Sequence, residues 1–111
     1  MAGFQVKVVL EGVQPPLWRR ILLPDQLSFA DLHVILQIVF GWQEEHLHDF
    51  SFQRSRVRIS DTEYADADLD EKDVCADSYL KAGWIRYTYD FGDDWRHKIV
   101  LEKELEDYEK R

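Results

Sequence analysis

Apolar and polar residues alternate along several short stretches of the chain, which is the pattern of strands with one buried face. Residues 4–11 alternate cleanly, and residues 17–23 resume the pattern after Pro15 and Pro16, so the two stretches predict a hairpin. Residues 46–52 and 57–60 predict two further strands, joined by a turn near residues 53–55. A last pair is predicted around Gly92, with apolar faces formed by Ile85, Tyr87, Tyr89 and Phe91 and then by Trp95, His97, Ile99 and Leu101.

One stretch has the period of an amphipathic helix instead. Ser28 is a suitable N-cap, with Asp31 three residues on, and Gly41 is a suitable C-terminal cap. The apolar stripe between the caps consists of Phe29, Leu32, Leu36, Val39 and Phe40. Residues 74–82 predict a second, short helix, and the charged residues 103–111 are compatible with a helix.

These elements predict an α+β fold in which residues 1–111 form a single domain. The sheet is expected to contain five or six mostly antiparallel strands, with the main helix (about 28–40) packed on one face. A hydrophobic content of 45% excludes a mainly disordered chain.

The net charge of −8 is concentrated in one segment. Residues 61–77 hold eight acidic residues against the single cation Lys72, a balance of −7, so the rest of the chain sums to −1. We expect this segment to be a solvated acidic loop. The rest of the chain, with a net charge of −1, lacks the broad basic surface that drives binding to nucleic acid. This charge disfavours nucleic acid as a partner.

The sequence also bears on where the protein resides. No apolar run approaches the roughly 18 residues that a membrane span needs, so no membrane association is expected. The N-terminus has no signal-peptide anatomy, and the lone Cys75 suits a reducing compartment. We therefore expect a cytoplasmic protein.

Three stretches, taken in order, resemble the plasmid pRiA4b Orf-three-like family. They are Pro16-Leu-Trp-Arg-Arg20; Asp31-Leu-His33 through Gly41-Trp42 to His46-Leu-His-Asp-Phe50; and Tyr89-Asp-Phe-Gly-Asp-Asp-Trp95 with His97. The resemblance covers almost the whole chain. It implies a compact α+β fold found in bacterial and archaeal proteins, some encoded on plasmids or beside transposases, and it implies no established activity. Family members continue past the equivalent of Leu101 with a Cys-Pro-Pro-Glu-Asp-like segment that is absent here, so the resemblance implies a short variant or a fragment.

The four histidines of the chain all lie in these stretches, and three of them form a candidate metal site. His46 and His48 share one face of a predicted strand, with Cα atoms roughly 7 Å apart. That spacing suits two imidazoles on one divalent metal, with His97 or Asp90 as a third ligand. The alternative is that the histidines bond to buried carbonyls and pack against Trp42 and Trp95.

The predicted turn around Gly92 is rich in aspartate and has two interpretations as well. Asp90, Asp93 and Asp94 lie beside His97, so they could bind a divalent ion or act as general acid and base. Alternatively, the aspartates and Gly92 are what such a turn requires.

A small basic patch is a further possibility. It would combine Arg54, Arg56 and Arg58 with Arg19 and Arg20, flanked by Trp18 and Phe52, as a surface for single-stranded nucleic acid. The alternative is an exposed strand face whose charges prevent edge-to-edge pairing.

We therefore expect a non-enzymatic binding or accessory domain, with a protein as one possible partner and no required cofactor. Its candidate binding groove comprises Trp18, Arg19, His33, Trp42, His46, His48, Asp90, Asp93, Trp95 and His97. One alternative is a metal-dependent hydrolase that uses some of the residues His33, His46, His48, His97, Asp90 and Asp93. The other alternative is an accessory protein that binds nucleic acid.

Overall fold

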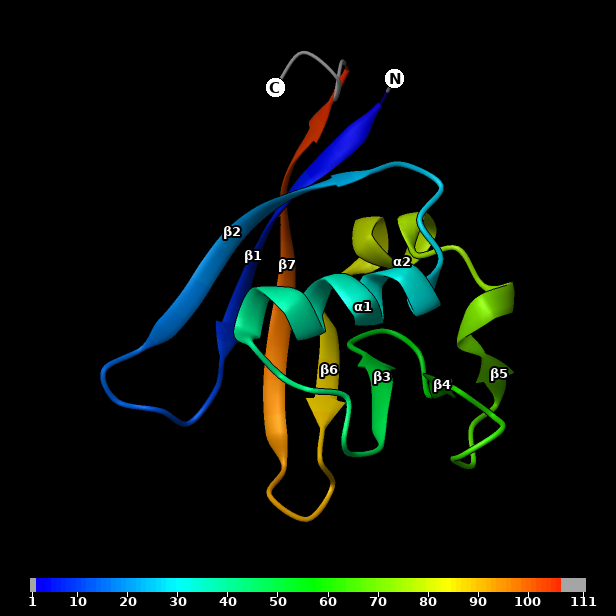
Figure 1. The fold of residues 1–111 in the computed structure, drawn as a ribbon. Coiled ribbons are helices and arrows are strands. Elements are labelled where there is room, and N and C mark those ends of the chain that lie inside the picture. Colours follow the sequence, from blue (N-terminus) through cyan, green and yellow to red (C-terminus); the bar gives the residue numbers. More distant parts are fainter. Residues whose placement is uncertain (1, 107–111) are drawn as a thin grey trace.

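The computed structural model describes residues 2–106, which form one sheet with two helices (Figure 1). The elements in chain order are β1 (Gly3–Leu10), β2 (Leu17–Pro24), α1 (Phe29–Phe40), β3 (His48–Phe52), β4 (Ile59–Ser60), β5 (Leu69–Asp70), the 3-10 turn η1 (Glu71–Asp73), α2 (Asp77–Ala82), β6 (Ile85–Tyr89) and β7 (Trp95–Leu105).

Within residues 2–106 the sheet has seven strands in the order β2-β1-β7-β6-β3-β4-β5, all antiparallel except the β4–β5 pair. The expectation of five or six strands was therefore too low, and the strand beyond the expected six is β5. This strand lies inside the segment expected to be a solvated loop. The backbone N–H groups of Asp68 and Leu69 both donate to the carbonyl of Arg58, which holds β5 beside β4.

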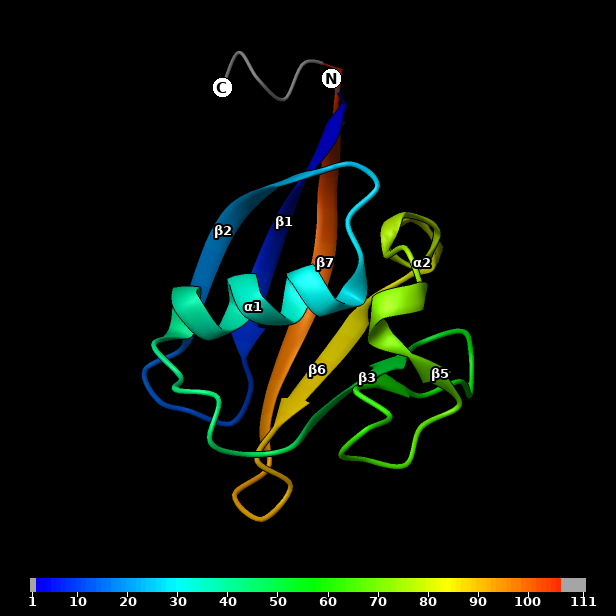
Figure 2. The same cartoon turned by 45° about the vertical axis from the view of Figure 1, so that its right-hand side comes forward.

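Helix α1 lies across one face of the sheet, as predicted (Figures 1 and 2). Ser28 caps it by accepting a hydrogen bond from the Asp31 N–H, and Gly41 ends it with a φ of +72°, a conformation that glycine adopts without strain. Its buried residues are Phe29, Leu32, His33, Leu36 and Gln37, so two polar side chains face the sheet together with the apolar stripe.

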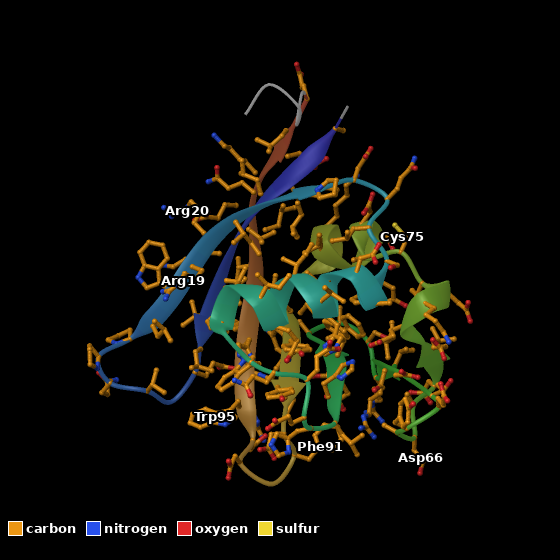
Figure 3. The ribbon with its side chains drawn as sticks, in the orientation of Figure 1. Arg19, Arg20, Asp66, Cys75, Phe91 and Trp95 are labelled. Atoms are coloured by element: carbon orange, nitrogen blue, oxygen red, sulfur yellow. The ribbon has the colours of Figure 1, made fainter. Side chains whose placement is uncertain are left out.

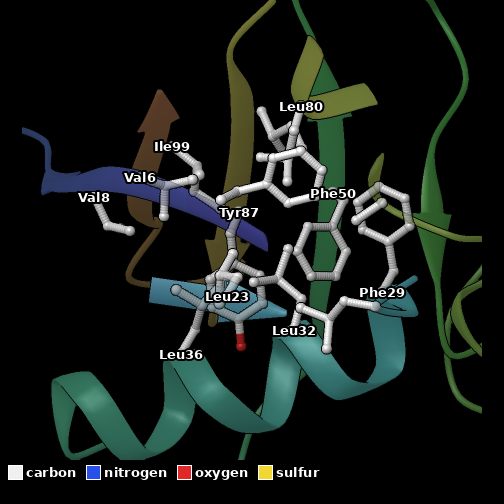
Figure 4. Close-up of a cluster of buried hydrophobic side chains, with 14 of the residues drawn as sticks. Val6, Val8, Leu23, Phe29, Leu32, Leu36, Phe50, Leu80, Tyr87 and Ile99 are labelled. Carbon is white, nitrogen blue, oxygen red and sulfur yellow. The ribbon is translucent and has the colours of Figure 1, made fainter. Parts of the chain in front are cut away.

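The core lies between α1 and the inward face of the sheet. Val6 and Val8 of β1, Ile85 and Tyr87 of β6 and Ile99 of β7 are fully buried there. Figure 4 shows the hydroxyl group of Tyr87 directed from this cluster toward α1. An uncharged hydroxyl buried in this way requires hydrogen-bond partners.

The hairpin of β6 and β7 forms as predicted, but glycine does not supply the left-handed backbone of its turn. Asp90 and Asp94 do so, each with a φ of +61°. The Asp90 side chain accepts hydrogen bonds from the N–H groups of Gly92 and Asp93, which confirms that aspartate caps this turn.

Two smaller expectations are corrected. The second helix begins at Asp77 rather than at residue 74, and β7 continues to Leu105, so residues 103–105 are strand rather than helix. Glu106 follows β7 as a bend, and the rest of the predicted helix-compatible tail, residues 107–111, lies outside the described residues. None of the described helices has the length and apolar character needed to cross a membrane.

Candidate functional site

A cavity of about 620 Å³ opens beside His33 of α1, between the residues that precede β3 and the segment that follows β4. It is lined by His33, Glu44, Glu45, His46, Leu47, His48, Ser60, Asp61, Tyr64, Ala65 and Glu71. Three of the four histidines of the chain therefore meet at one place, together with four acidic residues.

His33 is held by a closed ring of hydrogen bonds whose directions are fixed. The backbone N–H of Glu44 donates to Gln37 Oε1 over 2.8 Å, so the amide NH₂ of Gln37 faces Tyr87 and donates to its hydroxyl oxygen over 2.8 Å. The Tyr87 O–H then donates to His33 Nδ1 over 2.7 Å, and His33 Nε2–H donates to Glu44 Oε1 over 2.9 Å. His33 is therefore the neutral tautomer with its proton on Nε2.

Burial supports this protonation state. Removal from water lowers the pKa of His33, and the neighbouring imidazole of His48 lowers it further. Burial also raises the pKa of Tyr87 above its ordinary value, so the phenol keeps its proton. The ring of bonds thus joins α1, β6 and the segment that enters β3 without a buried charge on either aromatic side chain.

His48 forms the second half of the cavity floor. Its ring lies parallel to that of His33, with ring centroids 3.6 Å apart and an angle of 6° between the planes. His48 Nε2–H donates to Glu71 Oε1 over 2.6 Å, and both side chains are buried. His48 Nδ1 has no partner among residues 2–106 and is not one of their buried unpaired atoms, so it keeps some solvent exposure on a residue that lines the cavity.

The outer wall of the cavity is the segment between β4 and β5. Asp61 shapes it, because its carbonyl accepts hydrogen bonds from the N–H groups of Tyr64 and Ala65. Thr62 is fixed in turn by its hydroxyl, which donates to Asp70. Tyr64 stands on this wall with 67% of its surface exposed.

His97, Trp42 and Trp95 belong to a separate aromatic cluster. An indole N–H only donates, so the 3.0 Å contact from Trp42 Nε1 makes His97 Nε2 the acceptor. His97 Nδ1–H then donates to the carbonyl of Tyr87, and burial lowers the pKa of this histidine. Trp42 also lies 5.6 Å from Trp95, ring centroid to ring centroid.

The predicted metal ligands are consequently placed apart. Both ring nitrogens of His97 are bonded within the aromatic cluster, while His46 and His48 line the cavity. His46 lies before β3 rather than in it, half-exposed, with Nε2 3.5 Å from Asp90 Oδ2. Within residues 2–106, no three His, Cys, Asp or Glu residues are grouped so that they could hold a metal ion.

The remaining predicted groove residues lie at two other places. Asp90 and Asp93 belong to the β6–β7 turn, outside the cavity lining. Trp18 and Arg19 lie on β2, at the far edge of the strand order from β4 and β5. Figure 3 shows Arg19 and Arg20 on this strand, well away from Asp66.

The expected basic patch does not exist as one surface. Four strands separate β2, which carries Arg19 and Arg20, from β4. Arg58 is bonded to Asp49, and Arg20 to Glu102, whose pKa this guanidinium lowers to about 2. Phe52, the expected flanking aromatic, packs instead against Phe29 and Tyr79.

The acidic part of the site is not evident from the sequence. Glu71 was treated as one of eight acids in a solvated segment, yet it is only 5% exposed and bonds to His48. The sequence of the helix does indicate a polar site, because His33 and Gln37 are four residues apart on its buried face, where apolar residues are expected.

Comparison with known proteins places the chain among relatives of unknown function. A family model described as "Plasmid pRiA4b ORF-3-like protein" matches residues 2–111. The uncharacterised protein y4hQ of Sinorhizobium fredii (strain NBRC 101917 / NGR234) is 33% identical over 102 residues, which are 89% of this chain and 53% of y4hQ. The chain thus spans about half the length of this curated relative.

A solved structure agrees with the fold. The crystal structure of MM3350 from Methanosarcina mazei Go1, described as a protein of unknown function, superposes with a TM-score of 0.86 at 35% identity, over 99% of this chain and 65% of MM3350. The family match over residues 2–111 and this superposition lead to one conclusion: the chain belongs to the plasmid pRiA4b ORF-3-like protein family.

Proposed function

We propose that the chain is a binding domain that holds a cationic, hydrogen-bond-donating group of its ligand in the cavity over His33 and His48. The observation that carries this proposal is the composition of the lining, which has four carboxylates and three imidazoles but no lysine or arginine among the described residues. Carboxylates around a partly enclosed cavity attract cations more strongly than they would in open water.

The individual groups support the same ligand chemistry. His48 Nδ1 carries a lone pair toward the cavity, since its other nitrogen donates to Glu71, so it accepts a hydrogen bond from an ammonium or guanidinium group. The exposed ring of Tyr64 on the outer wall offers a face for a cation–π contact. Glu45 is free for a ligand, because its side chain bonds to none of residues 2–106 while its N–H donates to the Tyr89 hydroxyl.

Binding is favoured over catalysis by the state of the reactive groups. The one serine hydroxyl in the lining, that of Ser60, donates to the backbone carbonyl of His48 and so is not paired with a base. Both nitrogens of His33 are engaged in its ring of hydrogen bonds. No specific observation favours the metal-dependent hydrolase, which stays a prediction.

Small probes test the proposal. Titration with n-butylguanidinium or n-butylammonium, followed by amide chemical shifts in ¹H–¹⁵N spectra, should move the signals of His48, Ala65 and Glu71. We expect dissociation constants on the order of millimolar for probes of this size. The neutral n-pentanol should bind at least several-fold more weakly.

A pair of variants controls for charge alone. Glu45→Gln removes one carboxylate from the lining and should weaken the cationic probes, whereas Asp31→Asn removes the same charge from an exposed position on α1 and should not. Equal binding of n-pentanol, or equal effects of the two variants, would show that the cavity is not a cation site.

A further inference from the structure

A second hollow of about 340 Å³ lies on the opposite face of the sheet, across β3, β6 and β7. Asp49, Arg86, Thr88 and Arg96 line it, and in each strand these residues alternate with side chains that are buried under α1. Arg58 and Arg96 complete a set of three guanidinium groups with Arg86, so the hollow is called the arginine pocket below.

Each of the three guanidiniums is oriented by one carboxylate. Arg58 donates through Nε and Nη2 to Asp49 Oδ2, at 2.8 and 2.6 Å. Arg86 donates through the same two nitrogens to Glu11, and Arg96 through Nε to Asp94. A guanidinium has five N–H groups, so each of the three keeps at least three of them unused within the described part of the chain.

Two hydroxyl groups add to the donors. Ser51 and Thr88 line the arginine pocket, and their hydroxyls have no protein partner within residues 2–106. Neither oxygen is one of the buried unpaired atoms, so both are open to the pocket.

We propose that the arginine pocket binds the phosphate group of a ligand. Guanidiniums that are already fixed by carboxylates present their remaining N–H groups without further loss of side-chain freedom, and their planar fork matches phosphate oxygens. Three guanidiniums and two hydroxyls offer more hydrogen-bond donors than the two oxygens of a carboxylate can accept. A phosphate has three or four oxygens, so it can accept more of these hydrogen bonds. The side chain of Phe91, which Figure 3 labels, lines the pocket, is 41% exposed and offers an apolar contact for the group that carries the phosphate.

The arginine pocket and the cavity over His33 and His48 each share lining residues with a third hollow. This third hollow, of about 440 Å³, shares Leu47, Tyr64 and Ala65 with that cavity, and Arg58 and Phe91 with the arginine pocket. The phosphate site itself does not rest on the proposed function, because its residues and its probes are different.

The test uses methyl phosphate, dimethyl phosphate and acetate in a phosphate-free buffer of low ionic strength, followed by amide chemical shifts of Ser51, Thr88 and Arg96. Methyl phosphate should bind more tightly than acetate by at least five-fold. Arg96→Gln should weaken methyl phosphate by about ten-fold, the loss of one charge-assisted hydrogen-bond donor. Arg19→Gln, which removes an exposed cation on β2, is the matched control and should change little.

A gain of affinity makes the test independent of folding damage. Asp94→Asn removes the carboxylate that competes for Arg96, and asparagine tolerates the positive φ at this position, so methyl phosphate should bind about three-fold more tightly. Dimethyl phosphate binding as tightly as methyl phosphate would assign the site to the diester phosphates of nucleic acid, and weaker binding would assign it to a phosphate monoester. Acetate binding as tightly as methyl phosphate, or no binding of either phosphate at millimolar concentration, would overturn the proposal.

Discussion

Tyr87 and His33 are 54 positions apart in the chain and are joined by a 2.7 Å hydrogen bond inside the core. The bond links β6, the middle strand of the sheet, to α1, and Gln37 adds a second bond from the same helix to the same hydroxyl. The positions of α1 and of the cavity floor are therefore set by polar contacts as well as by apolar packing. Such a buried network is stable only while every member has a partner.

The network predicts the proton positions on two histidines. His33 should carry its proton on Nε2, and His97 should carry its proton on Nδ1, because Tyr87 and Trp42 donate to the other nitrogen of each ring. Long-range ¹H–¹⁵N spectra at pH 7.5 distinguish the two tautomers by their nitrogen shifts. The same tautomer on both rings would contradict the directions assigned to these hydrogen bonds.

Stability should fall in mildly acidic solution. Burial lowers the pKa of both His33 and His97 in the folded chain, while both titrate near the ordinary value of about 6.5 when unfolded. The unfolded state then binds more protons below that pH, so the free energy of unfolding is fully present above about pH 6.5 and declines as the pH falls toward the lowered folded values. Urea unfolding at pH 7.5 and pH 5.5 measures the loss.

The controls for this dependence are variants of the two histidines. His33→Asn or His97→Asn, each less stable than the parent, should flatten the pH profile between pH 7.5 and 5.5, because one shifted group has been removed. A profile that stays equally steep in both variants would assign the dependence to other groups.

Removal of one buried oxygen should be costly. Tyr87→Phe leaves the Gln37 NH₂ and His33 Nδ1 without their common partner, so we expect a loss of roughly 2 kcal/mol in the free energy of unfolding. Tyr79→Phe makes the same chemical change at a half-buried tyrosine whose hydroxyl bonds to none of residues 2–106, and it should cost less than about 0.5 kcal/mol. Similar losses in the two variants would show that the bonds to the Tyr87 hydroxyl contribute little.

Much of the fold could be read from the sequence because most elements are long enough to show a period. The stripe from Phe29 to Phe40 and the alternation from Ile85 to Leu101 each repeat over several turns or pairs, so α1 and the hairpin were predicted correctly. Strand β5 has two residues, Leu69 and Asp70, and two residues cannot show a period of two. Its place is set by the carbonyl of Arg58, a contact with a residue ten or more positions earlier.

The candidate site was only partly predictable for a related reason. The histidines stood out because the chain has four of them, but burial distinguishes Glu71 from its acidic neighbours only after β5 and η1 have brought it to His48. The separation of His97 from His46 and His48 likewise depends on the indole of Trp42, which bonds to the ring nitrogen that a metal would need. Residue type indicates candidate chemistry, whereas tertiary contacts decide which groups are free to perform it.

The burial of Glu71 leads to a prediction that separates it from the other acids of its segment. Glu71→Ala leaves the Nε2–H of the buried His48 without its acceptor, so we expect a loss of about 2 to 3 kcal/mol in the free energy of unfolding. Asp73→Ala, an exposed acid in the same 3-10 turn, should change it by less than about 0.5 kcal/mol. Urea unfolding at pH 7.5 measures both. Each variant removes one negative charge from the same acidic segment, so a general relief of charge repulsion would stabilise both variants equally. Equal changes in the free energy of unfolding would mean that the bond between Glu71 and His48 does not hold η1 against the sheet.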